Sequence, residues 1–256
     1  MSGVRSAEEE LIAAIVESDD NGSRIPDAVA GIDLDLHRGA AAQLQVLDRH
    51  LASGDELAGW KVGMTSGESH NAMGDGVRPF GALRRSRLFH SGDTVSLARI
   101  PGAGIEVELG VVIGNAVGGP DVSREEIVEA IDGWVPCFEL IQNRMGAVAA
   151  GSRIAANLSQ WGVVAGTVGA LDTVVSDLVV TIERDGVTVA TAGPGYEIDD
   201  PIESLCALCA RLSRFGVGLL PGQRVITGAF VKQPVAAPGH WRGTVSGVGD
   251  VEFTFK

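Results

Sequence analysis

One ten-residue segment, Gly104–Ile113, constrains the fold of this chain more than any other. Its sequence, GIEVELGVVI, is rich in Val and Ile and begins with glycine, which is typical of a β-strand. Because side chains alternate between the two faces of a strand, Glu106 and Glu108 point to the same side. Two carboxylates on one face of an apolar strand repel each other and are costly to bury. The pattern predicts that something positive, such as a divalent cation, lies between them.

A third carboxylate strengthens this hypothesis. The apolar run Trp134–Ile141 carries a single acid, Glu139. Mg²⁺ or Mn²⁺ prefers octahedral coordination by oxygen, and three carboxylates leave positions open for water or a chelating substrate. The competing interpretation is that Glu106 and Glu108 lie on a solvated sheet face and that Glu139 forms a salt bridge. Because Glu139 lies in a comparably apolar setting, we favour a metal site made of these three glutamates.

The charge of the chain restricts its partners. A net charge of −13 argues against nucleic acid and against anionic membrane surfaces, both of which select clustered Lys and Arg. A small anionic substrate would then need local positive charge from a metal, a Lys or an Arg. No stretch approaches the roughly 20 apolar residues of a membrane-spanning helix, and the acidic N-terminus shows no signal peptide. We therefore expect a cytoplasmic protein.

The cysteines agree with that compartment. The chain has three, Cys137, Cys206 and Cys209, and an odd number in a chain of this length fits a reducing environment. Cys206 and Cys209 fall in a helical pattern without a second cysteine pair or a histidine at zinc spacing. We interpret them as small core residues.

The sequence pattern divides the chain into a helical and a β-rich region. Residues 1–57 are predicted to form an N-terminal helical cap, with a helix that starts at the capping box Ser6-x-x-Glu9 and a second helix over Ala40–Leu51. The first helix is expected to stop at Asp19–Gly22. Residues 58–256 are predicted to form a β-rich catalytic domain of short strands separated by Gly, Pro and Asp.

The β-rich region contains several strands and two helices. Arg184–Val187 is a hairpin turn signal, because Asp-Gly favours a tight turn between strands. Helices are expected after Ser123 and after Asp200, the second ending at Gly216. The predicted strands are Trp60–Met64, Asp93–Leu97, Gly104–Ile113, Gly162–Gly166, Leu178–Glu183, Thr188–Ala190, Gln223–Thr227 and Gly249–Phe255. The fold class is α+β with a sheet-rich core.

Other polar residues have both functional and structural interpretations. Lys61, between Trp60 and Val62, is either a proton carrier or anion clamp beside a metal, or a lysine that extends to the surface. Ser159 lacks the sequence around a serine-hydrolase nucleophile. Two further groups are weaker candidates: the scattered His70, His90 and His240, and the arginines Arg84, Arg85 and Arg87, which either hold a carboxylate or solubilise a loop.

Taken in order, these segments resemble the 2-keto-4-pentenoate hydratase / 4-oxalocrotonate decarboxylase family of the fumarylacetoacetate hydrolase superfamily. The resemblance covers roughly residues 8–256. The matching runs are Trp60–Ser66, Phe80-Gly81, Ile105–Leu109, Pro136–Ile141 with Arg144, Ile154–Ser159, Val225–Gly228 and Gly247–Val251.

This resemblance implies a fold and a chemistry. It implies a mixed β-sheet roll, like the C-terminal part of fumarylacetoacetate hydrolase, with an N-terminal helical cap, assembled as a homo-oligomer. It implies Mg²⁺ or Mn²⁺ bound by Glu106, Glu108 and Glu139, with Lys61 and Ser159 as catalytic residues. The implied substrate is a small 2-hydroxy-dienoate or 2-oxo acid that chelates the metal, and the implied activity is that of a lyase, a hydratase acting in aromatic catabolism.

Alternatives remain within and outside this activity. They are decarboxylation of a 2-oxo-dioate, C–C hydrolysis of an acylpyruvate with His70 or His90 as base, tautomerisation, and a non-catalytic paralogue that serves as the partner of a related enzyme. Two positions depart from the family pattern, since Pro79 and Ala156 replace acids that are usual there. Two interpretations of these departures stay open: a changed substrate, such as a larger or more apolar one, and a catalytically weakened relative.

Overall fold

The computed structural model describes residues 5–146, 148–169 and 175–256. Within these ranges, twelve strands form two sheets. The seven-stranded sheet has the order β2 (Phe80–Arg84), β1 (Leu57–Val62), β10 (Arg224–Pro234), β5 (Gly104–Ile113), β6 (Ile131–Ile141), β7 (Gln160–Ala165) and β3 (Leu88–His90). The five-stranded sheet has the order β4 (Thr94–Val95), β12 (Gly249–Phe255), β11 (Gly239–Val245), β8 (Val180–Arg184) and β9 (Val187–Ala192).

Both sheets are mixed. The pairs β1–β10, β3–β7 and β4–β12 are parallel, and the other pairs are antiparallel. Apolar side chains of β5 and β6 meet those of β11 and β12, so Val107 and Phe138 contact the position of Gly243, and Phe138 packs edge-on against Phe253. The core of the β-rich region therefore lies between the two sheets, and the predicted α+β class is confirmed.

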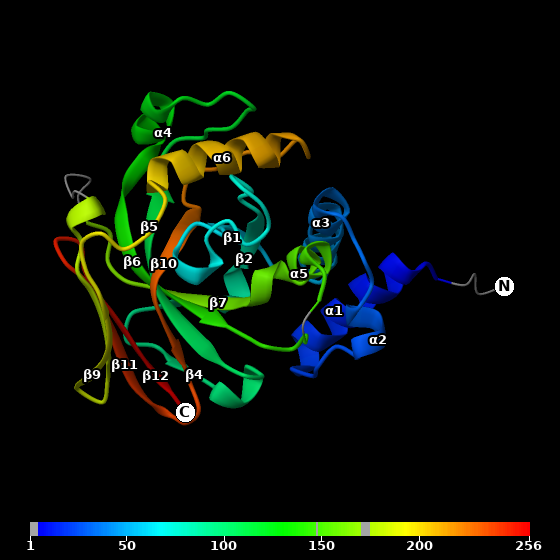
Figure 1. The fold of residues 1–256 in the computed structure, drawn as a ribbon, viewed down its shortest axis with the longest axis horizontal. Coiled ribbons are helices and arrows are strands. Elements are labelled where there is room, and N and C mark those ends of the chain that lie inside the picture. The colour runs from blue at the N-terminus through cyan, green and yellow to red at the C-terminus, as the bar shows by residue number, and fades with distance from the viewer. Residues whose placement is uncertain (1–4, 147, 170–174) are drawn as a thin grey trace.

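Helices cover the seven-stranded sheet and extend to one side of it. The α-helices are α1 (Ala7–Asn21), α2 (Asp27–Ala30), α3 (Leu36–Ala52), α4 (Arg124–Ala130), α5 (Ala150–Ala155) and α6 (Pro201–Ser213). Short 3₁₀ turns are η1 (Gly67–Ser69), η2 (Arg85–Arg87), η3 (Leu97–Arg99), η4 (Asn157–Ser159) and η5 (Val175–Asp177). Figure 1 shows α1, α2 and α3 grouped on the side of the molecule opposite the five-stranded sheet. The division into domains at residue 57 stays a prediction.

Most helix ends follow their sequence signals. Ser6 and Ser123 form the predicted capping boxes, and Asp200 caps α6, which begins with Pro201. The second N-terminal helix starts four residues before the predicted Ala40, because Asp35 accepts a hydrogen bond from the backbone N–H of Arg38. Gly39 fits inside this helix because its backbone lies against Gly151 of α5, where a Cβ atom would collide.

The predicted strands are present, but several have different lengths. β5 and β12 have the predicted bounds, and Asp185 and Gly186 both have positive φ in the turn between β8 and β9. β10 continues seven residues beyond the predicted Thr227, since a bulge at Gly228, with φ of 144°, lets the strand resume. β6 was expected only as the apolar run Trp134–Ile141. β2, β3 and β11 were not predicted, because their sequences are interrupted by Gly, Arg and His.

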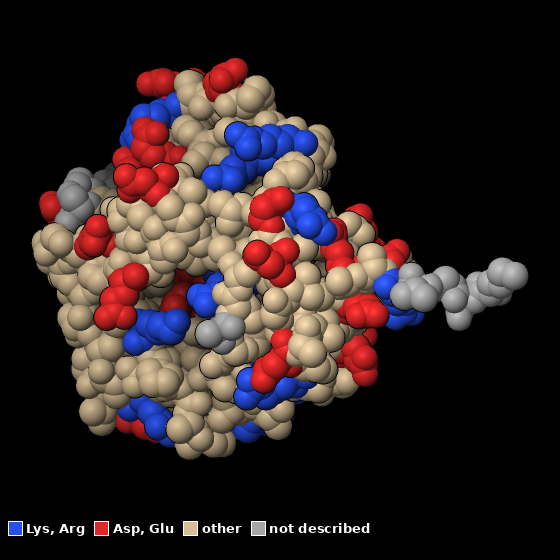
Figure 2. Space-filling view, turned by 45° about the vertical axis from the view of Figure 1, so that its right-hand side comes forward, with Lys and Arg blue, Asp and Glu red and all other residues tan. Residues whose placement is uncertain are grey.

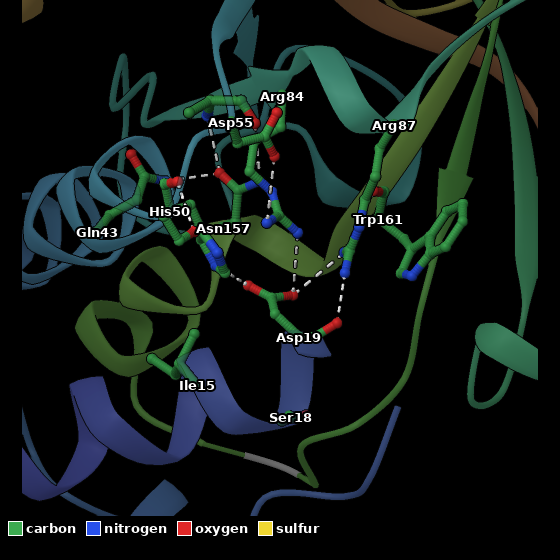
Figure 3. A network of polar contacts seen from close by, with 12 residues as sticks. Ile15, Ser18, Asp19, Gln43, His50, Asp55, Arg84, Arg87, Asn157 and Trp161 are labelled. Carbon is green, nitrogen blue, oxygen red and sulfur yellow. Dashed lines mark hydrogen bonds and ion pairs between the residues drawn. The ribbon is translucent and has the colours of Figure 1, made fainter. Parts of the chain in front are cut away.

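A buried ionic cluster joins the N-terminal helices to the sheet. Asp19 of α1 accepts hydrogen bonds from Arg144 (2.7 Å) and Arg87 (3.2 Å), and its second carboxylate oxygen lies 2.9 Å from Nε2 of His50. Figure 3 shows His50, Arg84 and Arg87 converging on Asp19 from separate elements. Burial alone would raise the pKa of Asp19, but Arg144, His50, Arg87 and Arg84 together hold it far below its usual range.

The cluster shows whether Arg84, Arg85 and Arg87 hold a carboxylate or solubilise a loop. Arg84 and Arg87 hold a carboxylate, but it is that of Asp19 in the same chain, and Arg85 is half exposed near Glu56. Cys206 and Cys209, predicted as small core residues, are partly buried and buried, and Cys137 is buried; all three are free thiols. Within the described ranges, the protein has no helix with the length and apolar character needed to cross a bilayer.

Candidate metal centre and pocket

The three glutamates meet because β5 and β6 are paired in antiparallel register. Glu106 lies directly opposite Glu139 across the two strands, and Glu108 follows on the same face of β5. One carboxylate oxygen from each lies within 4.8 Å of the others. Glu108 and Glu139 are buried, and Glu106 is partly exposed. Glu108 therefore does not lie on a solvated face, whereas the salt bridge that the competing interpretation expected for Glu139 is present, with Lys61 as its partner.

Lys61 extends from β1 into the same cluster. Its Nζ lies 2.5 Å and 2.7 Å from the two carboxylate oxygens of Glu139. The side chain lies flat on Gly81 of the neighbouring strand β2, where a Cβ atom would come within 2.7 Å of Cγ of Lys61. Lys61 is buried, so the alternative of a lysine that extends to the surface is wrong.

The ionisation of these groups reflects their burial. Burial raises the pKa of Glu108 well above its ordinary value, and the neighbouring Glu139 carboxylate raises it further. Burial is also the largest influence on the pKa of Glu139, which is raised although Lys61 opposes the shift. Burial lowers the pKa of Lys61, but Glu139, Glu108 and Glu106 outweigh it, so the net shift is upward.

The bulge in β10 supplies the remaining polar contact of Glu108. The backbone N–H of Gly228 donates a 2.8 Å hydrogen bond to Oε2 of Glu108. Glycine is required there because φ is 144° and a Cβ atom would collide with Oγ1 of Thr65. One oxygen of Glu108 is thus held by the backbone.

The chemistry of this donor set fits a hard divalent cation. The three carboxylates repel one another in a buried cluster and share one lysine as their cation. Carboxylate oxygens are the ligands that Mg²⁺ and Mn²⁺ prefer. Glu106, Glu108 and Glu139 are the residues that would hold such an ion. Lys232 of β10 adds a second ammonium group, 3.1 Å from Oε1 of Glu106.

A pocket opens above the cluster. It has a volume of about 160 Å³, and its wall includes Lys61, Glu106, Glu108, Leu158 and Ser159. A wider cavity of about 860 Å³ adjoins it and shares Ile141, Arg153, Ser159 and Lys232. Figure 2 shows a hollow on this face, with acidic atoms deep inside and basic side chains beside the opening.

A strained turn positions Ser159 at this pocket. Asn157, Leu158 and Ser159 have φ values of 59°, 53° and 68°, a left-handed run that is unfavourable for residues with a Cβ atom. The side chain of Asn157 stabilises the turn, since it accepts a hydrogen bond from the backbone N–H of Ala82 and donates one to its C=O. Sequence reasoning missed Asn157, although an Asn inside a matched motif is a usable signal.

The remaining candidates lie outside the pocket. His70 contacts Asp199, Glu197 and Arg78, and is not among the residues that line either cavity. His90 and His240 are exposed. Of the two departures from the family pattern, Ala156 lines the wider cavity, and Pro79 accepts a hydrogen bond from the N–H of Gly63 through its backbone C=O.

Comparison with known proteins gives a consistent group of relatives. No family model matches the chain. A 2-keto-4-pentenoate hydratase of Paraburkholderia xenovorans is 25% identical over 231 residues, covering 88% of this chain and 85% of the relative. A 2-hydroxyhexa-2,4-dienoate hydratase of Comamonas testosteroni is 26% identical over 222 residues, covering 83% of each chain.

Solved structures show the same fold. The 4-oxalocrotonate decarboxylase from Pseudomonas putida G7, complexed with magnesium and adipate, superposes with a TM-score of 0.89 at 23% identity over 99% of both chains. A fumarylacetoacetate isomerase/hydrolase structure from Oleispira antarctica superposes with a TM-score of 0.57 at 14% identity, over 77% of this chain and 92% of the other. The resemblance inferred from the sequence motifs and the mixed-sheet fold are both confirmed.

Proposed function

We propose that this chain, a relative of the 2-keto-4-pentenoate hydratases and 4-oxalocrotonate decarboxylases, is a divalent-metal-dependent hydro-lyase. Its proposed substrate is a 2-hydroxy-2,4-dienoate and its product a 4-hydroxy-2-oxo acid. The observation that carries the proposal is the convergence of Glu106, Glu108, Glu139 and Lys61, of which Glu106, Glu108 and Lys61 line one pocket. The hydratase relatives support the choice of reaction.

The metal in this proposal is Mg²⁺ or Mn²⁺. Glu106, Glu108 and Glu139 would hold it, since their oxygens are gathered within 4.8 Å. When bound, such an ion supplies a Lewis acid that polarises a 2-oxo group and stabilises its enolate.

Lys61 carries the proton in this proposal. Its Nζ is held at the base of the pocket by Glu139, so it faces a substrate bound over the acids. The ammonium group gives a proton to C5 while the proton of the 2-hydroxyl leaves to solvent, which forms the 2-oxo-3-enoate. The resulting amine takes a proton from the water that adds at C4 and passes it to C3 of the enolate, and solvent then returns a proton to the amine. Ser159, at the pocket wall, orients the substrate by hydrogen bonding through its hydroxyl.

The pocket wall also limits competing reactions. Val62, Ile141 and Leu158 contribute apolar surface beside the charged base. An apolar wall excludes bulk water from a reactive enolate. Only a single positioned water molecule, the one that adds to the alkene, then needs to reach the substrate. His70 is engaged by two carboxylates outside the pocket, so the geometry does not favour the hydrolase alternative.

Metal binding tests the proposal directly. Calorimetric titration of Mn²⁺ and Mg²⁺ into wild type and Glu108→Gln should show at least about ten-fold weaker binding in the variant. The amide keeps the size of the side chain and an oxygen for the Gly228 N–H, so the variant should fold. Glu126→Gln, a change on exposed α4, is the matched control. Equal affinities for wild type and Glu108→Gln would contradict the metal assignment.

Turnover then identifies the reaction. Purified protein is assayed with 2-hydroxypenta-2,4-dienoate and with a 4-oxalocrotonate-type 2-oxo-dioate, with metal and after chelation. Metal-dependent loss of dienoate absorbance without release of carbon dioxide supports hydration. Release of carbon dioxide would show that the reaction is decarboxylation and not hydration. Inactivity on both substrates would favour the non-catalytic paralogue.

The oligomeric state and the cellular compartment of the enzyme are part of the same proposal. A homo-oligomer in the cytoplasm is proposed, and the three free thiols support a reducing compartment. Association with a partner enzyme of the same reaction sequence stays a prediction.

A further inference from the structure

One wall of the pocket above the glutamates is a loop. Residues 63–79 join β1 to β2 and consist mostly of turns around η1. Met64, Thr65, Ser66 and Ser69 of this loop line the pocket together with Lys61 and the glutamates. A loop keeps a fixed position over a site only where contacts outside the loop hold it. The contacts that hold residues 64–69 therefore decide the shape of the pocket.

The backbone of the loop is tied to the segment that precedes α6. The N–H of Gly67 donates a 2.9 Å hydrogen bond to the C=O of Glu197, and the N–H of Asp199 donates one of 2.9 Å to the C=O of Thr65. An isolated antiparallel bridge lies between these two bonds. Each such bond contributes only about 1 kcal/mol, so the backbone alone holds the loop weakly.

The side chain of Asp199 adds contacts with charged groups of the loop. Its carboxylate accepts hydrogen bonds from Nε and Nη2 of Arg78, and its Oδ1 lies 2.9 Å from Nε2 of His70. Arg78 is buried, and the other two side chains are partly buried. Burial would raise the pKa of Asp199, but Arg78 and His70 outweigh it and lower the pKa. Hydrogen bonds between charged partners are stronger than those between neutral ones.

The three side chains fasten both halves of the loop to one point. His70 directly follows η1, whereas Arg78 lies near the end of the loop and also donates a 2.8 Å hydrogen bond to Oδ1 of Asn71. Nδ1 of His70 lies 3.0 Å from Oε1 of Glu197, but that carboxylate is 68% exposed, so solvent weakens the contact. Nε2 of His70, which faces Asp199, therefore makes the stronger contact.

We propose that His70, Arg78 and Asp199 form a clamp that positions the loop as a wall of the substrate pocket. None of the three is among the described residues that line this pocket. They act through Thr65 and its neighbours, so they are positioning residues. The effect on the substrate rests on the proposed function, whereas the effect on the loop does not.

Hydrogen exchange tests the clamp without any assay of activity. Asp199→Asn keeps the size of the side chain and the backbone bond to Thr65 but removes the charge. We expect the amides of residues 64–70 to exchange about ten-fold faster in this variant than in wild type. Asp250→Asn is the matched control, since Asp250 accepts a hydrogen bond from Arg242 in the five-stranded sheet. Its exchange over residues 64–70 should equal that of wild type.

Steady-state kinetics test the effect on the pocket. With 2-hydroxypenta-2,4-dienoate and Mg²⁺, Asp199→Asn should raise KM about ten-fold and change kcat less than about three-fold, because Lys61 and the glutamates are untouched. His70→Gln keeps a donor near the position of Nε2 and should retain the KM of wild type. His70→Asn places its donor near Nδ1 instead and should raise KM. General loss of stability would not distinguish these two substitutions in this way.

The outcomes separate the clamp from the proposed function. Equal exchange in wild type and Asp199→Asn would overturn the clamp, and so would faster exchange with an unchanged KM. The same KM for His70→Gln and His70→Asn would remove His70 from it. Absence of turnover in wild type would contradict the proposed function, and hydrogen exchange would then decide on the clamp by itself.

Discussion

Lys61 and Glu139 form a buried ion pair between residues 78 positions apart in the chain. Burying an ion pair is costly, and both members also crowd against Glu108. A pair of this kind is weak evidence of stabilisation, so its presence at the base of a pocket points to chemistry instead.

Replacing Lys61 by Ala should separate catalysis from metal binding. We expect turnover of the dienoate to fall by about 10²- to 10⁴-fold, because the variant loses its proton carrier. Mn²⁺ should still bind, since all three glutamates remain. Turnover and calorimetry on Lys61→Ala are compared with Lys256→Ala, which removes the lysine outside the pocket. Unchanged turnover would remove Lys61 from the mechanism.

Asn157 is expected to matter for stability through the backbone it holds. Asn157→Ala leaves the N–H and C=O of Ala82 without these partners and keeps the left-handed strain, so we expect a loss of about 1–3 kcal/mol in the free energy of unfolding. Asn157→Gly also loses the amide but relieves the strain, and it should unfold at a higher urea concentration than Asn157→Ala. Identical midpoints for the two variants would show that the left-handed backbone costs nothing.

Single residues were predictable where a charged side chain interrupts an apolar strand. Glu106, Glu108, Glu139 and Lys61 carry that signal in their own segments. The position of Arg153 could not be predicted in this way, because its place in the lining of two cavities is set by tertiary structure. The roles of Asp19 and Asn157 equally depend on distant partners.

At the scale of elements, α1 is joined to the sheet through one carboxylate. Asp19→Asn should lower the free energy of unfolding by about 3–5 kcal/mol near neutral pH, because several buried cations lose their anion. Glu8→Gln, which breaks the ion pair with exposed Arg38, should have little effect. Urea denaturation of both variants measures this, and equal midpoints for Asp19→Asn and wild type would contradict it.

The same substitution has a defined pH dependence. The pKa of Asp19 is lowered in the folded chain, so its stabilisation is fully present above the ordinary value of 3.8. As the pH falls below that value, the unfolded chain takes up the proton first and the stabilisation is progressively lost. The difference in unfolding free energy between wild type and Asp19→Asn should therefore shrink between about pH 5 and pH 3. A constant difference over this range would contradict the shift.

Elements with local signals were predicted better than those fixed by contacts. The capping boxes at Ser6 and Ser123 and the Asp185-Gly186 turn are encoded within a few residues. The full length of β10 was not, because it depends on a bulge at Gly228 that pairs with β5 and contacts Thr65. Pairing between strands, rather than local sequence, sets that strand's end.

At the scale of the whole molecule, we expect more than one chain in solution. β9 lies at the edge of the five-stranded sheet and exposes 65% of Val187 and 40% of Val189. An open edge strand with exposed valines is costly to leave in water and is suited to burial against another chain. Light scattering should give a mass of at least twice 26.5 kDa. A mass of one chain across the micromolar range would contradict the oligomer.

The antiparallel register that sets Glu106 opposite Glu139 has an evolutionary consequence. The acids are fixed by pairing between two central strands, and a one-residue slip would move them to opposite faces. Arg153 and Ala156 instead belong to a short helix and its end, outside the sheet. Mutations there can change which substrate is accepted while the acids stay in place, so descendants of one ancestor can diversify by altering α5 and retain an inherited reaction centre.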